Sequence, residues 1–253
     1  MIDEPFATGS TLFHRRDPKV KIIGAAAISI VLALCTSIPV AATGCITTAI
    51  LLYLSKPNFG LLSKRLIQVN IFTLFIWLTL PLTYGSGETV HFSFLSIHLD
   101  GVRLATLISL KTNGILLCFL ALLATSSTVS LGYGLEKLGV PRKLSFLFLF
   151  AYRQLFVIHL EYQRLQRAAK LRGFTPKNSL HTYQTYSHLF GMTLVKSWNR
   201  AERVHQAMIL RGFNGRLIPL TQPQPGKADY FFLSIMLLIS LFLAGLSLVS
   251  VSQ

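Results

Sequence analysis

Five long apolar runs, separated by short polar stretches, dominate the pattern of hydrophobic and polar positions along the chain. They are Ile22–Ile38, Val40–Leu54, Leu66–Tyr84, Val102–Thr125 and Tyr230–Val251. A helix that crosses a bilayer needs about 20 residues, most of them apolar. Four runs come close to that length, and Val40–Leu54 is short, with 15 residues. The pattern therefore predicts an all-α, polytopic membrane protein with about five spans.

Polar residues between the runs predict where helices begin and end. Asp17 and Pro18 precede the first run and indicate a helix start, with proline in the first turn. Pro81, near the end of the third run, should kink or end that helix. Gly85–Gly101 is long and polar, and its partly alternating residues predict a short β-hairpin. Its two histidines, His91 and His98, have no acidic neighbours at ligand spacing and are expected to be surface residues.

The charge distribution predicts the orientation of the chain in the membrane. Only 13% of the residues are charged, whereas soluble proteins have about 25%, and the net charge is +15. With the N-terminus in the cytoplasm, 22 of the 24 lysines and arginines lie on the cytoplasmic side. The positive-inside rule counts short loops near helix ends, so the first seven of these basic residues carry the argument and the long basic segment adds less. The rule predicts a multi-pass protein of the cell (inner) membrane with a cytoplasmic N-terminus and an external C-terminus.

This orientation divides the chain into three parts. Residues 1–127 form a membrane domain with four spans and an outside hairpin at 85–101. Residues 128–227 form a basic, mostly helical cytoplasmic region, and residues 228–253 form a C-terminal span. The apolar run Leu144–Leu160 within the basic region is long enough to be counted as a sixth span, so the number of spans is five or six.

A seven-residue motif occurs twice in the basic region. Ala168–Phe174 and Ala207–Phe213 both have the form Ala-x-x-Leu-Arg-Gly-Phe, 39 residues apart. If each copy is helical, positions i, i+3, i+4 and i+7 share one face. That face carries Leu165, Ala168, Ala169 and Arg172 in the first copy, and Val204, Ala207, Met208 and Arg211 in the second. Each helix thus presents a narrow stripe of apolar and small residues that ends in an arginine.

The residues after each arginine predict how these helices end. Gly173 and Gly212 follow directly, and a glycine in the left-handed conformation is a common helix stop. Each arginine then lies at the negative end of its helix dipole, and a phenylalanine, Phe174 or Phe213, follows the turn. One such copy would fit a basic amphipathic helix on an anionic lipid surface. Two matched copies favour two equivalent acidic grooves, such as a dimeric partner presents.

These residues resemble a known family. Two X-Arg-Gly motifs in cytoplasmic helices of a protein with about five spans resemble the transmembrane T component of energy-coupling factor (ECF) transporters. The second motif is most similar to the cobalt/nickel type, the CbiQ family. The similar segments are Asp17–Lys21, Leu138–Pro141, Tyr152–Arg153 and Arg200–Gly215. The chain departs from many members at Leu171 and Leu210, where alanine or serine usually precedes the arginine.

The resemblance implies a mechanism and a set of partners. Two ATP-binding cassette subunits dimerise when they bind ATP, and each has a groove that receives one X-Arg-Gly helix end. The T component holds a separate substrate-binding membrane subunit and passes the motion of the ATPases to it. The implied docking residues are Arg172, Arg211, Gly173, Gly212, Ala168, Ala207, Phe174 and Phe213. The arginines would pair with acidic groups, the glycines would turn the chain away, and the alanines would allow close approach.

The sequence gives no sign of chemistry within the chain itself. It has no Gly-x-x-x-x-Gly-Lys-Ser/Thr loop, so a partner would hydrolyse any ATP that is used. It has no obvious metal-binding cluster, and we expect no catalytic residue, no cofactor and no nucleic-acid partner. The transported substrate stays open between cobalt, nickel and a vitamin. Cobalt is favoured only by the resemblance.

Two other classes of function are weighed against transport. A membrane enzyme acting on lipids or prenyl chains usually needs acidic clusters for Mg²⁺, but the nine acidic residues are scattered along the chain. A basic platform for lipid headgroups or RNA would bind equally well with lysine in place of arginine.

Several polar residues and the three cysteines lie inside the apolar runs. Lys111 and Asn113 lie within the fourth run, and Lys111 either has a function or pairs with a carbonyl group inside the bundle. The three cysteines, without close spacing, are expected to be packing residues.

Overall fold

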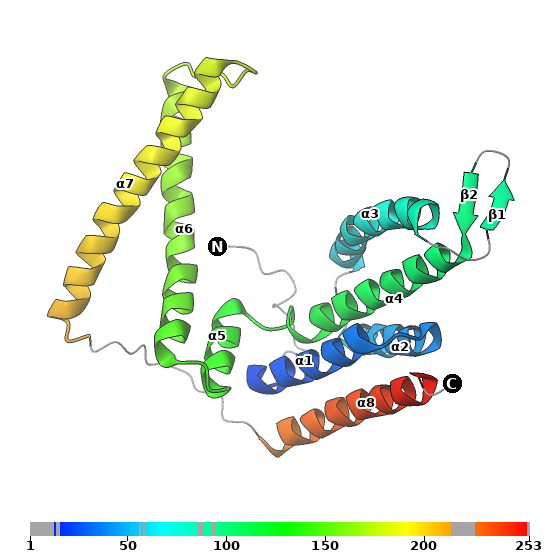
Figure 1. Cartoon of the computed structure of the whole chain (residues 1–253). Helices are drawn as coiled ribbons and strands as arrows, with labels where there is room; N and C mark the ends of the chain where they lie inside the picture. Colours follow the sequence, from blue (N-terminus) through cyan, green and yellow to red (C-terminus); the bar gives the residue numbers. More distant parts are fainter. Residues whose placement is uncertain are drawn as a thin grey trace. The chain divides into compact units, whose positions relative to one another are not determined.

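The computed structural model describes residues 13, 16–55, 57, 59–84, 89–92, 95–213 and 226–251. It divides the chain into two compact units (Figure 1). The transmembrane unit comprises residues 4–138 and 223–253, and the hairpin unit comprises residues 139–222. The helices are α1 (Pro18–Leu34), α2 (Ile38–Leu54), α3 (Phe59–Thr83), α4 (Leu99–Leu122), α5 (Thr128–Lys137), α6 (Arg142–Leu171), α7 (Leu180–Leu210) and α8 (Lys227–Val251).

The five predicted spans coincide with α1, α2, α3, α4 and α8, which confirms the polytopic helical class. Helices α3, α4 and α8 are long and apolar enough to cross a membrane, and so is α6 in the hairpin unit. Helices α1 and α2 have 17 residues each, and 17 residues of helix rise only about 25 Å. Many large apolar side chains on α3 are exposed, among them Ile71, Phe72 and Leu74, as expected of a surface that faces lipid.

Helix α4 lies against α1, α2 and α3, while α8 packs on α1 and α2. The core of the transmembrane unit forms where these helices meet. Ile28 and Leu32 of α1 are fully buried there, together with Ala121 and Leu122 of α4. Met236 of α8 belongs to the same cluster. Small residues allow close approach of the helices, as packing within a membrane requires.

The predicted hairpin is present between α3 and α4. Strands β1 (Thr89–Phe92) and β2 (Leu95–His98) pair antiparallel, with Thr89 opposite His98. Helix α3 ends at Thr83, two residues after Pro81, in line with the predicted effect of this proline. His98 precedes the first residue of α4, while the side chain of His91 lies outside the described residues. Within the described residues, no group of three His, Cys, Asp or Glu side chains could hold a metal ion.

The hairpin unit consists of α6 and α7, which have 30 and 31 residues and pack against each other (Figure 1). Lys196 of α7 donates a hydrogen bond to Glu161 of α6 at 2.7 Å. Tyr162 and Phe190 stack with ring centroids 5.3 Å apart. These contacts join the C-terminal half of α6 to the middle of α7.

Candidate docking site at two matched helix ends

The first copy of the repeated motif forms the end of α6. The backbone N–H of Gly173 donates to the carbonyl of Lys170 at 3.0 Å, and the N–H of Phe174 donates to the carbonyl of Ala169 at 3.1 Å. Gly173 has a φ of 81°. Two such bonds around a left-handed residue make a Schellman motif. Arg172 is therefore the capping residue of the helix, as predicted.

The second copy forms the end of α7 in the same way. Gly212 has a φ of 74°, its N–H donates to the carbonyl of Ile209 at 2.9 Å, and the N–H of Phe213 donates to that of Met208 at 3.0 Å. Arg211 takes the capping position that Arg172 takes in α6. The local conformation predicted from the Arg-Gly-Phe sequence is thus confirmed in both copies.

The two copies of the motif also share the same pattern of exposed and partly buried side chains. Each arginine and the leucine before it are exposed, with Leu171 at 89% and Leu210 at 88% of their full accessibility. The stripe positions are partly buried in both copies, as is the phenylalanine after each turn. These residues are Leu165, Ala168, Ala169 and Phe174 in α6, and Val204, Ala207, Met208 and Phe213 in α7. Each helix end therefore presents one exposed leucine and one exposed arginine, next to stripe residues and a phenylalanine that are partly buried.

The two phenylalanines pack at opposite ends of the hairpin unit. Phe174 lies edge-on to Tyr186 in the first turns of α7, with ring centroids 5.7 Å apart. Phe213 contacts Phe146 in the first turns of α6, with centroids 5.2 Å apart. The helices are therefore antiparallel, and 30 residues of helix separate the two arginines by about 45 Å. This arrangement gives two equivalent basic ends rather than one basic patch.

An apolar cavity of about 570 Å³ lies in the hairpin unit where α6 and α7 cross. Val157 and Ile158 line it from α6, and Leu194, Val195 and Trp198 line it from α7. Trp198 is 74% exposed, so a large apolar surface is available beside the cavity. Sequence periodicity alone did not indicate this feature, because a cavity depends on where two helices cross.

Lys111 has a partner inside the transmembrane unit. Its ammonium donates to the carbonyl of Ala33, in the last turn of α1, at 2.9 Å. This contact matches one of the two alternatives that the sequence left open, pairing with a carbonyl, and the positive charge suits the C-terminal end of a helix. Asn113 of the same helix exchanges two hydrogen bonds, each of 3.1 Å, with Asn70 of α3.

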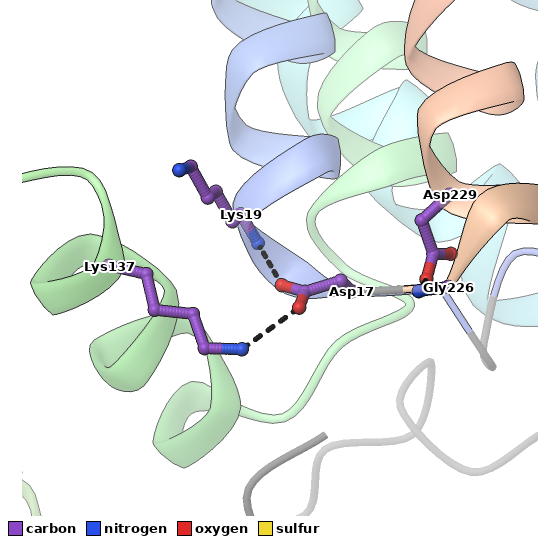
Figure 2. A network of polar contacts seen from close by, with 5 residues as sticks. All are labelled: Asp17, Lys19, Lys137, Gly226 and Asp229. Atoms are coloured by element: carbon purple, nitrogen blue, oxygen red, sulfur yellow. Dashed lines mark hydrogen bonds and ion pairs between the residues drawn. The ribbon is translucent and has the colours of Figure 1, made fainter. Parts of the chain in front are cut away.

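Sequence reasoning missed a network of polar contacts at the start of α1 (Figure 2). Lys137, the last residue of α5, donates to Asp17 at 2.9 Å, and Lys21 donates to Ser126 at 2.6 Å. These pairs lie more than 100 residues apart in the sequence. The only local signal was the capping position of Asp17, which identified the helix start but not the lysine that binds there.

The fold and the two helix ends define a multi-pass helical membrane protein with a basic helical hairpin. The sequence model of the CbiQ family, described as "Cobalt transport protein", matches residues 9–223. The chain belongs to the CbiQ family, which confirms the resemblance seen in the sequence.

Several relatives are similar to this chain over most of their length, at 26–27% identity. An uncharacterized protein of Methanocaldococcus jannaschii is 26% identical, over 91% of this chain and 88% of its own length. Two of the similar proteins that carry the name energy-coupling factor transporter transmembrane protein EcfT come from Brevibacillus brevis and Macrococcus caseolyticus. That of Brevibacillus brevis is 26% identical, over 83% of each chain. That of Macrococcus caseolyticus is 27% identical, over 85% of each chain.

Proposed function

We propose that this chain is the transmembrane T subunit of an ECF-type importer and passes the motion of two ATPase subunits to a separate substrate-binding membrane subunit. The observation that carries the proposal is the pair of matched helix ends, each with an exposed arginine on the same Schellman turn. The names of the EcfT relatives support the same role. In this role the chain is not an enzyme, and the partner subunits hydrolyse ATP.

The two arginines act as the docking groups. Arg172 and Arg211 each enter a groove of one ATPase subunit and pair with acidic side chains there. Removing one partner of a buried charge pair costs about 2–5 kcal/mol, so each arginine contributes strongly to assembly. Antiparallel helices support this proposal, because they present the two ends to two different subunits.

The docking role is tested by co-purification of the chain with ECF-type ATPase subunits of its own organism in detergent. Arg172→Ala combined with Arg211→Ala should abolish the association, because both charge pairs are lost. Arg164→Ala combined with Arg203→Ala is the matched control. These arginines occupy equivalent positions eight residues before the docking arginines, and their loss changes the net charge equally. The control variant should keep its ATPases.

Two results would overturn the docking role. Unimpaired association of the Arg172→Ala, Arg211→Ala variant is the first. Equal weakening of the docking variant and the matched control is the second, since it would indicate general charge attraction. Arg172→Lys combined with Arg211→Lys distinguishes specific docking in a groove from binding to any anionic surface. Binding to an anionic surface survives this exchange, whereas a planar arginine pair in a groove does not.

Cobalt is the cargo that we propose, since the family is described as cobalt transport. Cells that produce the complete transporter should accumulate radiolabelled Co²⁺ and lose this uptake when both docking arginines are replaced. Uptake of a labelled vitamin but not of Co²⁺ would retain the T-subunit role with a different cargo. A lipid-modifying enzyme is the other candidate, and turnover of a lipid by the purified chain alone would favour it.

A further inference from the structure

Two adjacent residues of opposite charge lie at the start of α1, and each binds a different helix. Asp17 caps α1, because one of its carboxylate oxygens accepts the backbone N–H of Lys19 at 2.9 Å. Its other oxygen accepts the ammonium of Lys137 at 2.9 Å. The side chain of Asp17 is only 1% exposed. Figure 2 shows both contacts converging on this carboxylate, with the ammonium of Lys19 pointing away from it.

Helix α5 is held to α1 at three points. The pair of Lys137 and Asp17 fixes its C-terminal end. Lys21, fully buried, donates to Ser126 at 2.6 Å and so fixes the residues just before its N-terminal end. In between, Gly134 lies so close to α1 that an added Cβ would be 3.1 Å from a carbon of Pro18. These three contacts together hold α5 closely against the first turns of α1.

Arg16 makes the corresponding contact with α8. Its guanidinium lies 3.5 Å from the carboxylate of Asp229 and 6.0 Å from the ring centroid of Phe232. Asp229 also accepts the backbone N–H of Gly226 at 2.9 Å, which fixes the first turn of α8. Asp229 is buried apart from 11% of its side chain. The first turn of α8 is thus tied to the residue next to Asp17.

In the sequence, these contacts lie beside both ends of the hairpin unit. Lys137 is the last residue of α5, and the hairpin unit begins two residues later at Gly139. Asp229 lies in the first turn of α8, just after the chain returns from the hairpin unit. Arg16 and Asp17 therefore hold both the point where the chain leaves the transmembrane unit and the point where it returns.

We infer that Arg16 and Asp17 are positioning residues that fix both connections of the coupling hairpin to the transmembrane unit. This inference rests on the proposed function, because it gives the contacts a role in passing motion between subunits. Gly139, with a φ of 98° and no atom near its Cβ position, is the first residue beyond the fixed part. A force on the hairpin then reaches α1 and α8 instead of displacing α5 alone.

The first experiment measures amide hydrogen exchange of the full chain in nanodiscs. Asp17→Asn keeps the capping oxygen but removes the charge, and Lys137→Met keeps the length of the side chain without its charge. Both should make the amides of α5 exchange about tenfold faster or more, a change that corresponds to roughly 1.4 kcal/mol of local stability. Lys137→Arg should restore slow exchange. Unchanged exchange in α5 would overturn the inference.

The second experiment measures whether motion is still transmitted in the complex with the ATPases. Nitroxide labels at Val129 on α5 and Gln206 on α7, both exposed, report the distance between them with and without a non-hydrolysable ATP analogue. The three native cysteines are first replaced by alanine. The labelled chain with Asp17 and Lys137 unchanged should give a narrow distribution of label distances that shifts when the nucleotide binds. Asp17→Asn and Lys137→Met should broaden it and remove the shift, and Lys137→Arg should retain it.

Matched controls separate this role from a general loss of charge. Lys19→Met removes a lysine beside Asp17 whose ammonium points away from it, and Asp100→Asn makes the same change at an exposed carboxylate in the first turn of α4. Neither should alter exchange or distance. A normal shift in Lys137→Met with its ATPases bound would overturn the transmitting role. Failure of the proposed function is distinct, since the unmodified chain would then not retain ATPases, while the exchange experiment needs none.

Discussion

At the scale of single residues, Gly173 and Gly212 decide how the arginines are presented. No atom lies within 4 Å of a Cβ built on either glycine, so space does not select glycine at these positions. The positive φ does, because a side chain in the left-handed region collides with its own backbone. Each arginine is therefore held in place by a backbone turn that the next residue makes possible.

The glycine at the end of α7 can be tested against one inside the same helix. Gly212→Ala should weaken the last turn of α7 by about 1–2 kcal/mol, because alanine must adopt φ near 74°. Gly191→Ala, also with open space around its Cβ, should instead stabilise α7 by roughly 0.5–1 kcal/mol. Hydrogen exchange of α7 amides measures both. Effects of the same sign at the two positions would contradict this explanation.

At the scale of helices, α3 and α4 are joined within the membrane by the amides of Asn70 and Asn113. Each amide donates to the oxygen of the other at 3.1 Å, and each also donates to a carbonyl one turn earlier in its own helix. Within lipid, such polar pairs bring helices together that have no hydrophobic reason to associate. The pair thereby fixes the contact between α3 and the rest of the bundle.

A double-mutant cycle measures the strength of this pair. Asn70→Leu and Asn113→Leu should each destabilise the transmembrane unit, and their effects should be non-additive by about 0.6–1.7 kcal/mol. The stability is measured by reversible unfolding in mixed micelles. Gln68→Leu, an exposed polar residue on the same helix, should show no coupling to Asn113→Leu. Additive effects of the two asparagine variants would show that the pair contributes nothing beyond its separate residues.

At the scale of the whole molecule, the orientation in the membrane depends on whether α6 crosses it. Helix α6 meets the length and hydropathy of a span, yet it carries seven charged residues over its 30 positions. A charged group at the centre of a bilayer is costly. We therefore expect α6 to stay on the cytoplasmic side, where both docking arginines meet the ATPases.

Fusions to green fluorescent protein at each end of the chain test this topology. Green fluorescent protein does not fluoresce after export through the bacterial Sec pathway, so only a cytoplasmic end gives a bright fusion. The N-terminal fusion should be bright and the C-terminal fusion dark, as five spans and the positive-inside rule predict. A cysteine placed in the outside hairpin should react with an impermeant reagent added to whole cells. A bright C-terminal fusion together with a reactive hairpin cysteine would mean an even number of spans and would place α6 in the membrane, whereas a bright fusion with an unreactive cysteine would mean that one of the first three helices does not cross.

The sequence by itself determined the features that depend on neighbouring residues. The apolar runs gave the five helices, and the Arg-Gly-Phe pattern gave both helix ends, because their hydrogen bonds join residues at most five positions apart. The tertiary structure alone decided which distant groups meet. Asp17 binds Lys137 across 120 residues, and Arg16 binds Asp229. Such pairs depend on how whole helices pack, and no local pattern encodes that packing, so the positions that fix the coupling hairpin became visible only in the folded chain.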